Sequence, residues 1–371
     1  MVMYRVGLIG AGRKGTQHAL AYMVDNRTEV VAFADTDPEN LELFHKRTGI
    51  TAYADYREML EKERIDIAAP ILPVSANPDV VIACAESGVR AILCEKPVSA
   101  SLSEVDHMVS VCNNHDVVFG AGDLDVNLPV YQKALEFISA GHLGDVKSIT
   151  LFGGPGTEMS GGGCQRFTLM RHFAGCAEVA WVIGWVSGDP QSDNDQGVSG
   201  YVRFTNDIEG LIYREQDSRG RGYEVACENG IFRSDENLAA LYRYRENDGP
   251  SWEKMEKIEG VLPEGRIYGE ERGYDSDGWK WPGDRNVASC KEIIDAMEQS
   301  REPPGSGENA ARVLELAIGL RESHRRGSVP VELPLHDRSL RIIPSEARMY
   351  NKKPIFGRDK YMEQVLNHKK D

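Results

Sequence analysis

The chain has 371 residues, of which 41% are hydrophobic and 27% charged, and its formal net charge is -15 at pH 7. This length accommodates two domains with a substantial core. A surface this acidic repels phosphate backbones and anionic lipids, so nucleic acid and membranes are excluded as expected partners. The seven cysteines show no Cys-x-x-Cys spacing, which favours reduced thiols over a metal site. With neither a long apolar run nor a signal-peptide pattern, the sequence predicts a cytoplasmic protein without a bound metal.

The first candidate site is a glycine-rich turn near the N-terminus. A short apolar run, Val6 to Ile9, precedes GAGRKG, in which Gly10, Gly12 and Gly15 have the spacing Gly-x-Gly-x-x-Gly. A helical stretch follows, and then a β-branched run ends at Asp35, twenty positions after Gly15. This combination is the fingerprint of dinucleotide binding, because the glycines permit a tight turn, close approach of the backbone to a pyrophosphate, and close packing of helix on strand.

Charges near this turn indicate which dinucleotide is bound. Asp35 is expected to accept hydrogen bonds from the ribose hydroxyls. A 2′-phosphate would be repelled by Asp35 and also by Asp37, so the sequence favours NAD over NADP. Arg13 and Lys14 lie within the turn and are expected to contact the cofactor, where they would offset this preference by reaching a phosphate.

Strands and helices alternate through the first third of the chain, which predicts a doubly wound parallel sheet. Ligands of such sheets bind outside the carboxyl ends of the strands. The apolar run Ala91 to Cys94 ends at Glu95, Lys96 and Pro97. We therefore expect Lys96 to lie in the same crevice as the glycine turn.

From residue 146 onward the pattern becomes rich in strands that alternate apolar and polar residues, which predicts an antiparallel sheet with one covered face. The fold class expected is therefore α/β, with an N-terminal Rossmann sheet and a C-terminal α+β domain. We place an NAD-binding domain at 1–122, a substrate-binding and oligomerisation domain at 123–335, and a C-terminal arm at 336–371.

Taken together, these motifs are similar to those of the Gfo/Idh/MocA oxidoreductases, the glucose–fructose oxidoreductase and inositol dehydrogenase family. The resemblance covers residues 4 to about 335. It rests on the glycine turn, on ADTDPE with Asp35, on Glu95-Lys96-Pro97, and on the later stretches SAGHLGDVKSI and GENAARVLELAIGLRES. It implies a C-terminal domain whose open, mostly antiparallel sheet pairs between subunits, giving a homo-oligomer such as a dimer or tetramer.

The resemblance also implies a reaction, the NAD(P)-dependent oxidation of a hydroxyl of a sugar, an inositol-like polyol or a sugar derivative. In this family Lys96 would bond the reacting hydroxyl and exchange its proton, and Glu95 would lie near the nicotinamide ribose. Leu72 and Asn77, in the loop after the strand near residue 70, would complete the cofactor site. Asn77 stands where the family often has a histidine, and its amide can still bond a ribose.

The catalytic helix departs from the family pattern of an Asp followed four positions later by a His. One alignment puts Met170 and Ala174 at these positions, and a second puts Thr168 and His172 there. The carboxylate is missing in both. We take His172 as a catalytic candidate and Arg171 as a further substrate-binding candidate; a hydrogen-bonded helix histidine is the equal alternative.

A second departure is the loop AGDLDVNLP, in which Asp123 and Asp125 would share one face of an extended segment. Either carboxylate could bind sugar hydroxyls or replace the missing acid, although solvated turn carboxylates are an equal alternative. The function predicted first is an NAD-dependent sugar or polyol dehydrogenase. The alternatives are an NAD-retaining glycoside-cleaving hydrolase or lyase acting through transient C3 oxidation, and a non-catalytic NAD- or sugar-binding protein.

Overall fold

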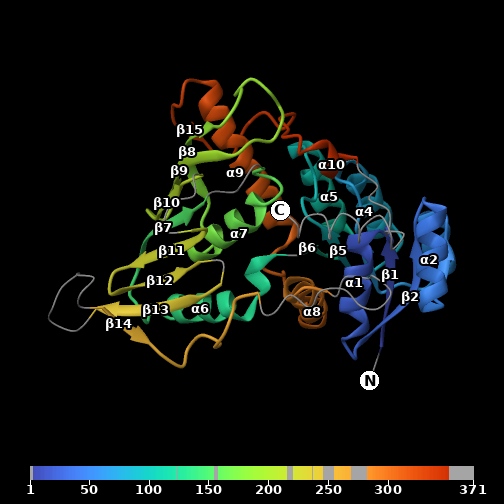
Figure 1. Cartoon of the computed structure of the whole chain (residues 1–371). Coiled ribbons are helices and arrows are strands. Elements are labelled where there is room, and N and C mark those ends of the chain that lie inside the picture. The colour runs from blue at the N-terminus through green and yellow to red at the C-terminus, as the bar shows by residue number, and fades with distance from the viewer. Residues whose placement is uncertain are drawn as a thin grey trace, which may run out of the picture.

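The computed structural model describes residues 3–122, 124–153, 158–214, 220–235, 237–244, 255–268 and 282–350. Two sheets form its framework, with helices packed between and around them (Figure 1).

The N-terminal sheet has six parallel strands in the order β3-β2-β1-β4-β5-β6. The strands are β1 (Tyr4–Ile9), β2 (Thr28–Ala34), β3 (Thr51–Tyr53), β4 (Ile67–Pro70), β5 (Ala91–Glu95) and β6 (Val118–Gly122). Their connections are α1 (Arg13–Met23), α2 (Pro38–Thr48), α3 (Tyr56–Lys62), the 3-10 turn η1 (Val74–Ala76) with α4 (Asn77–Glu86), and α5 (Leu102–Asn114). This strand order is that of a Rossmann fold, so the predicted fold class is confirmed for the first part of the chain.

Local signals account for the limits of these elements. The Asp37 carboxylate accepts a hydrogen bond from Glu39 N and caps α2, and Gly49 ends that helix at a φ of 70°. A side-chain cap at the first turn and a left-handed glycine after the last turn are the usual boundaries of a helix. The central strands β4 and β5 are buried on both faces, which is why they read as continuous apolar runs.

The second sheet has nine strands in the order β14-β13-β12-β11-β7-β10-β9-β8-β15. Its strands are β7 (Val146–Phe152), β8 (Val179–Val186), β9 (Val198–Phe204), β10 (Glu209–Ile212), β11 (Gly222–Cys227), β12 (Gly230–Ser234), β13 (Ala239–Tyr244), β14 (Met255–Ile258) and β15 (Val331–Glu332). All neighbours are antiparallel except β7 and β10. The expectation of a mostly antiparallel second sheet is confirmed.

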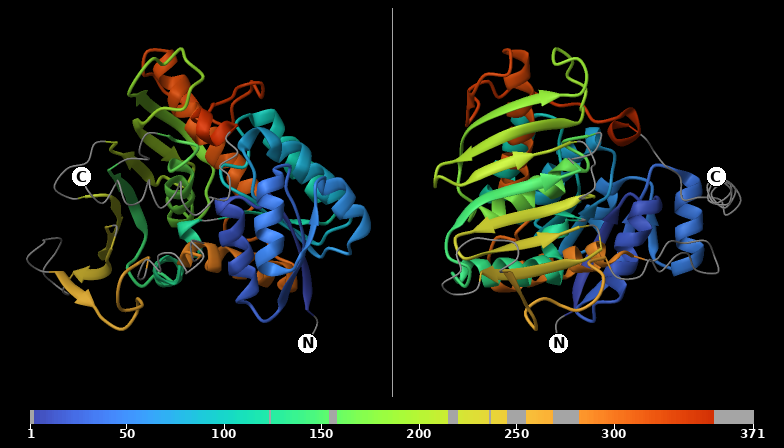
Figure 2. Two further views of the ribbon diagram at one scale, coloured as in Figure 1. Left: turned by 45° about the vertical axis from the view of Figure 1, so that its right-hand side comes forward. Right: turned by 60° about the vertical axis from the view of Figure 1, so that its left-hand side comes forward.

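Helices cover one face of this sheet, and in the second view of Figure 2 the strands face the viewer with the helices behind them. These helices are α6 (Pro129–Ser139), α7 (Gly163–Phe173) and α9 (Gly307–Arg325), and the 3-10 turn η2 (Asp125–Asn127) precedes α6. A Cβ atom at Gly184 of β8 would lie 2.5 Å from Leu320 O of α9, so the helix packs directly on the strand backbone. The opposite face of β8 carries Trp181, Ile183 and the half-exposed Trp185.

The chain returns to the N-terminal sheet with α8 (Asp284–Gln299), which lies beside α1 in Figure 1. Cys290, Ile293, Ile294 and Met297 of α8 belong to the same buried cluster as residues of β1, β2 and β4. The domain limits expected at residues 122 and 335 remain predictions. Within the described ranges, no helix is long and apolar enough to cross a membrane.

Candidate active site

The glycine turn between β1 and α1 is shaped by close backbone contacts. Gly10 has a φ of 92°, and a Cβ atom there would lie 2.4 Å from Ile71 O. A Cβ atom at Gly15 would lie 1.9 Å from Gly10 O. Both positions therefore require glycine, and the turn leaves the N-terminus of α1 facing a crevice. A helix N-terminus attracts anions such as a pyrophosphate.

The crevice has a volume of ≈ 1080 Å³ and follows the carboxyl ends of the N-terminal strands. Every cofactor residue predicted from the sequence lines it, except Asn77. The predicted residues in its lining are Gly10, Gly12, Arg13, Lys14, Gly15, Asp35, Leu72, Glu95 and Lys96. The size of the crevice and the glycine-lined turn fit a dinucleotide.

Asp35 at the end of β2 is held by backbone and side-chain donors. Its carboxylate accepts hydrogen bonds from Ala11 N at 2.7 Å, Asp37 N at 2.9 Å and Asn40 Nδ2 at 3.1 Å. The contact with Ala11 ties Asp35 directly to the glycine turn. The carboxylate is thus fixed in the crevice where the fingerprint expects ribose hydroxyls to bind.

Glu95 is paired with a residue that the sequence analysis missed. His18 of α1 is fully buried, and its Nε2 atom lies 2.9 Å from Glu95 Oε2 and 3.3 Å from Asn286 Nδ2 of α8. The signal in the sequence was weak, since a lone histidine one turn after Gly15 is indistinguishable from a core residue. Its role follows only from the contact with Glu95.

The turn after β5 presents Lys96 to the crevice. The peptide bond between Lys96 and Pro97 is cis. Asn77 is completely buried behind this turn and donates a hydrogen bond from Nδ2 to Pro97 O at 3.2 Å. Asn77 therefore supports the turn from behind, whereas the sequence analysis expected it at the cofactor.

A small pocket of ≈ 30 Å³ adjoins the crevice, and we call it the Lys96 pocket. Lys96 lines both spaces, and α7 contributes Cys164 and Thr168 to the pocket. Asn309 of α9 also lines it and donates from Nδ2 to Thr168 Oγ1 at 3.0 Å. The pocket has room for about one or two water-sized groups beside the lysine.

Arg171 and His172 lie away from this pocket. The Arg171 side chain is buried and donates from Nη1 to Asn309 Oδ1 at 3.0 Å, and burial lowers its pKa. His172 lines a separate cavity near α6 and β7, and its Nε2 atom lies 2.7 Å from Pro304 O. Burial also lowers the pKa of His172. The structure thus does not bring His172 to Lys96, and it brings Arg171 there only through Asn309.

The two carboxylates of the loop after β6 have different outcomes. Asp123 lies outside the described residues. Asp125 is buried and accepts from Arg285 Nη1 at 3.2 Å and from Tyr268 Oη at 3.3 Å. Arg285, from α8, also donates to Gln165 Oε1 at 3.2 Å and lines the crevice. Asp125 therefore positions an arginine at the crevice, a contact that the sequence analysis did not anticipate.

Comparison with known proteins identifies the class to which this fold and crevice belong. Residues 4–123 match the family model described as "Oxidoreductase family, NAD-binding Rossmann fold". This match covers about the first third of the chain, and it identifies that part as an NAD-binding Rossmann domain similar to those of the Gfo/Idh/MocA oxidoreductases.

Curated relatives match only part of the chain. Myo-inositol 2-dehydrogenase of Thermotoga maritima is 30% identical over 136 residues, which are 36% of this chain and 40% of that protein. The rhizopine catabolism protein MocA of Rhizobium meliloti is 27% identical over 230 residues, which are 54% of this chain and 71% of that protein. For the first two curated relatives, the match spans only 40% and 38% of their length.

Solved structures share the fold over nearly the whole chain. An oxidoreductase from Agrobacterium radiobacter, solved with NAD+, L-tartaric acid and magnesium, has a TM-score of 0.70 at 16% identity, covering 89% of this chain and 98% of that chain. Levoglucosan dehydrogenase in complex with NADH and levoglucosan has a TM-score of 0.68 at 19% identity, covering 90% of this chain and 100% of that chain. At these identities the likeness concerns the fold.

Proposed function

We propose that this protein is an NAD-dependent oxidoreductase that oxidises a hydroxyl of a sugar, a polyol or a sugar derivative. The observation that carries the proposal is the position of Lys96, which lines both the dinucleotide-sized crevice and the small pocket next to it. A hydroxyl placed at this junction would meet the lysine and the cofactor together. The named activities of relatives, among them myo-inositol 2-dehydrogenase and D-apiose dehydrogenase, support this class of substrate.

In this proposal the glycine turn and the N-terminus of α1 bind the pyrophosphate, and Asp35 binds the adenosine ribose. Bound NAD supplies a hydride acceptor for the substrate carbon. Lys96 accepts the hydroxyl proton as that carbon is oxidised, so that one hydride and one proton leave the alcohol. Glu95, held by His18, lies beside this lysine and orients the groups around it.

The catalytic helix lacks the family's Asp–His pair, so another residue has to supply the second polar group that contacts the substrate. Thr168 lines the same pocket as Lys96, and we propose that its hydroxyl, held by Asn309, contacts the substrate. Catalytic roles for His172 and Asp123 remain predictions from the sequence, as does substrate binding by Arg171. No contact in the described residues favours an NAD-retaining glycoside-cleaving enzyme or a non-catalytic binding protein.

The choice of NAD over NADP belongs to the proposal as well. Asp35 supports it, because a fixed carboxylate at the ribose would repel a 2′-phosphate. One relative, D-xylose 1-dehydrogenase of Haloferax volcanii, is named for NADP(+). Arg13 and Lys14 line the same crevice and would attract a 2′-phosphate. The ratio of NAD affinity to NADP affinity therefore has to be measured.

We further propose that the uncovered face of the second sheet pairs with a second copy of the chain. The rings of Trp181 and Tyr201 stack there with centroids 5.2 Å apart. Trp185 of β8 is 49% exposed, and Tyr213, which directly follows β10, is 45% exposed. Large aromatic side chains on one sheet face are typical of an interface. No disulfide joins cysteines of the described residues, which supports a cytoplasmic location.

The test of the function is a screen of sugars, inositols and sugar derivatives with NAD, in which formation of NADH is followed by absorbance. We expect steady NADH formation with at least one polyol or sugar, and on the order of 100-fold less with Lys96→Ala. Absence of turnover over the whole panel, with NADP as well as NAD, would contradict the proposed class of substrate.

A further inference from the structure

The chain after β15 crosses the molecule as an extended segment before it reaches the crevice. Its backbone first pairs with the start of α5, where Ser103 N donates to Arg338 O at 2.9 Å and Ile342 N donates to Ala100 O at 2.8 Å. The Ile342 side chain is completely buried. These contacts fix the segment on the N-terminal layer.

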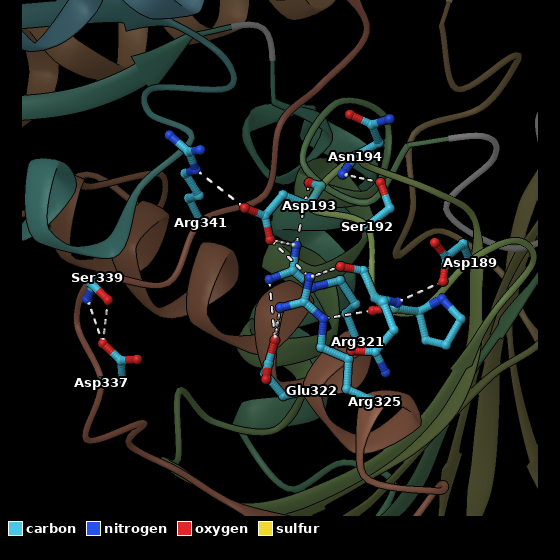
Figure 3. A network of polar contacts seen from close by, with 12 residues as sticks. Asp189, Ser192, Asp193, Asn194, Arg321, Glu322, Arg325, Asp337, Ser339 and Arg341 are labelled. Atoms are coloured by element: carbon cyan, nitrogen blue, oxygen red, sulfur yellow. Dashed lines mark hydrogen bonds and ion pairs between the residues drawn. The ribbon is translucent and has the colours of Figure 1, made fainter.

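The segment is then fixed to the second layer through a network of charges, shown in Figure 3. Asp193 accepts from Arg325 Nη2 at 2.8 Å and from Arg341 Nε at 3.3 Å, and the fully buried Arg321 lies 3.6 Å away. Ile343 N donates to Asp193 O at 2.8 Å. Residues 341–343 are thus held by both layers at once.

The end of this segment forms one wall of the crevice. Its last described part is the short helix α10 (Glu346–Met349), and Ser75 Oγ in the loop after β4 donates to Met349 O at 2.8 Å. The segment contributes four residues to the lining that includes the glycine turn and Lys96, namely Ser345, Ala347, Arg348 and Tyr350. The C-terminal segment therefore belongs to the cofactor crevice.

One carboxylate holds this wall in place. Glu158 forms an ion pair with Arg348 and accepts a hydrogen bond from Ser345 N at 2.7 Å. The Glu158 side chain is 11% exposed and that of Arg348 is 40% exposed, and both line the crevice. Burial raises the pKa of Glu158, but the hydrogen bond from Ser345 and the charge of Arg348 outweigh it and keep the pKa below its ordinary value.

We propose that residues 345–350 are a part of the cofactor site, in which the Glu158–Arg348 ion pair acts as a latch that slows the release of the bound dinucleotide. This inference rests on the proposed function only in taking NAD as the ligand of the crevice. A bound dinucleotide would have to leave past a wall that is fastened at Glu158. Opening the latch lets the wall move away from the crevice without changing the glycine turn.

Arg348 could instead attract the cofactor phosphates directly, and two variants distinguish this role from a latch by their rates of NADH release. Arg348→Ala and Glu158→Gln both break the latch, so both should speed release. If Arg348 acted through its charge alone, Glu158→Gln would leave that charge unpaired and slow the release. The two single variants, the double variant and Arg348→Lys therefore separate a latch from a phosphate ligand.

The experiment measures NADH release by stopped-flow fluorescence after displacement with excess NAD. We expect each single variant to release NADH about two- to five-fold faster, the range that one partly exposed ion pair allows, with no further gain in the double variant. Arg348→Lys keeps a positive charge for Glu158, so it should release NADH more slowly than Arg348→Ala does. Arg341→Ala is the matched control, because this exposed arginine lies in the same segment, is paired with Asp193 and does not line the crevice.

Unchanged release in Arg348→Ala, with an unchanged melting temperature, would overturn the latch, and so would opposite effects of the two single variants. These outcomes are separate from the fate of the proposed function. If the variants release NADH faster but the protein oxidises no sugar or polyol, only the proposed substrate class is contradicted. If the protein oxidises a sugar or polyol with NAD but the variants release NADH at the unaltered rate, only the latch is contradicted.

Discussion

His18 Nε2 lies 2.9 Å from Glu95 Oε2, which ties the helix after the glycine turn to the residue just before Lys96. Asn286 of α8 reaches the same imidazole nitrogen at 3.3 Å. Three segments that are remote in the chain therefore meet at one buried histidine. The orientation of Glu95 beside Lys96 depends on this contact.

The first prediction concerns this histidine. His18→Leu leaves Glu95 without its partner in a partly buried place, and we expect unfolding to become easier by about 1–3 kcal/mol. NAD affinity should fall as well, because Glu95 lines the crevice. Chemical denaturation and calorimetric titration measure the two effects. His115→Leu, at the exposed end of α5, is the control and should change neither. Equal effects in both variants would refute a specific role for His18.

Cofactor choice is tested at Asp35. Asp35→Ala removes the carboxylate that would repel a 2′-phosphate, so the ratio of NADP to NAD affinity should rise on the order of ten-fold. Calorimetric titration with both cofactors gives this ratio. Asp55→Ala removes the carboxylate that caps α3 and does not line the crevice, so it should lower stability without changing the ratio. Tighter binding of NADP than NAD by the unaltered protein would disprove the preference.

Lys96 is predicted to act in chemistry. Lys96→Ala should lower kcat by on the order of 100-fold or more, as expected for the loss of an acid–base group, with little change in melting temperature or NAD affinity. Lys96→Arg places a guanidinium there, which stays protonated at neutral pH and cannot accept the hydroxyl proton, so it should be almost as inactive. Steady-state kinetics with the substrate found in the screen measure these effects. Lys62→Ala, at an exposed ion pair on α3, should keep full turnover. Activity retained in Lys96→Ala would move the proton transfer to another residue.

His172 gives a prediction about pH. Burial is the main cause that lowers its pKa below the ordinary 6.5, so the folded protein disfavours the protonated ring. As the pH falls, the unfolded chain takes up this proton first. The contribution of His172 to stability is therefore complete above about pH 6.5 and is lost as the pH falls from there toward the lowered value.

His172→Gln should weaken this loss of stability at acid pH, because glutamine does not titrate and can still donate to Pro304 O. Turnover should stay close to that of the unaltered protein, because His172 does not line the crevice or the Lys96 pocket. Melting temperatures between pH 5 and 8 and the pH profile of kcat are the measurements. A large fall in kcat, with loss of an acid limb in that profile, would instead support the catalytic role predicted from the sequence.

The last prediction concerns assembly. Trp185→Glu puts a charge on the uncovered face of the second sheet, and we expect the oligomer to dissociate because a buried charge without a partner is costly at an interface. Light scattering after size-exclusion chromatography measures the mass. Val24→Glu is the control, since Val24 is 62% exposed at the end of α1, away from that sheet. A monomeric unaltered protein would disprove the interface.

The sequence by itself determined the features that depend on neighbouring residues. The Gly10, Gly12 and Gly15 spacing, the acidic end of β2 and the position of Lys96 after β5 are all local, and parallel strands bring their carboxyl ends to one edge. The order of buried and alternating strands likewise predicted both sheets. These local features were enough to predict the crevice at the carboxyl ends of the parallel strands, but not Arg285 or the wall of residues 345–350 in its lining.

Only the tertiary structure decided which side chains complete the site. Thr168 and His172 share a face of α7, yet they lie about 6 Å apart along the helix axis. Packing of α7 against α9 leaves Thr168 in the lining of the Lys96 pocket and His172 in the lining of another cavity. The pairs His18–Glu95 and Glu158–Arg348 join residues that are far apart in the chain. Such contacts leave no periodic pattern, because they arise from the way separate elements pack together.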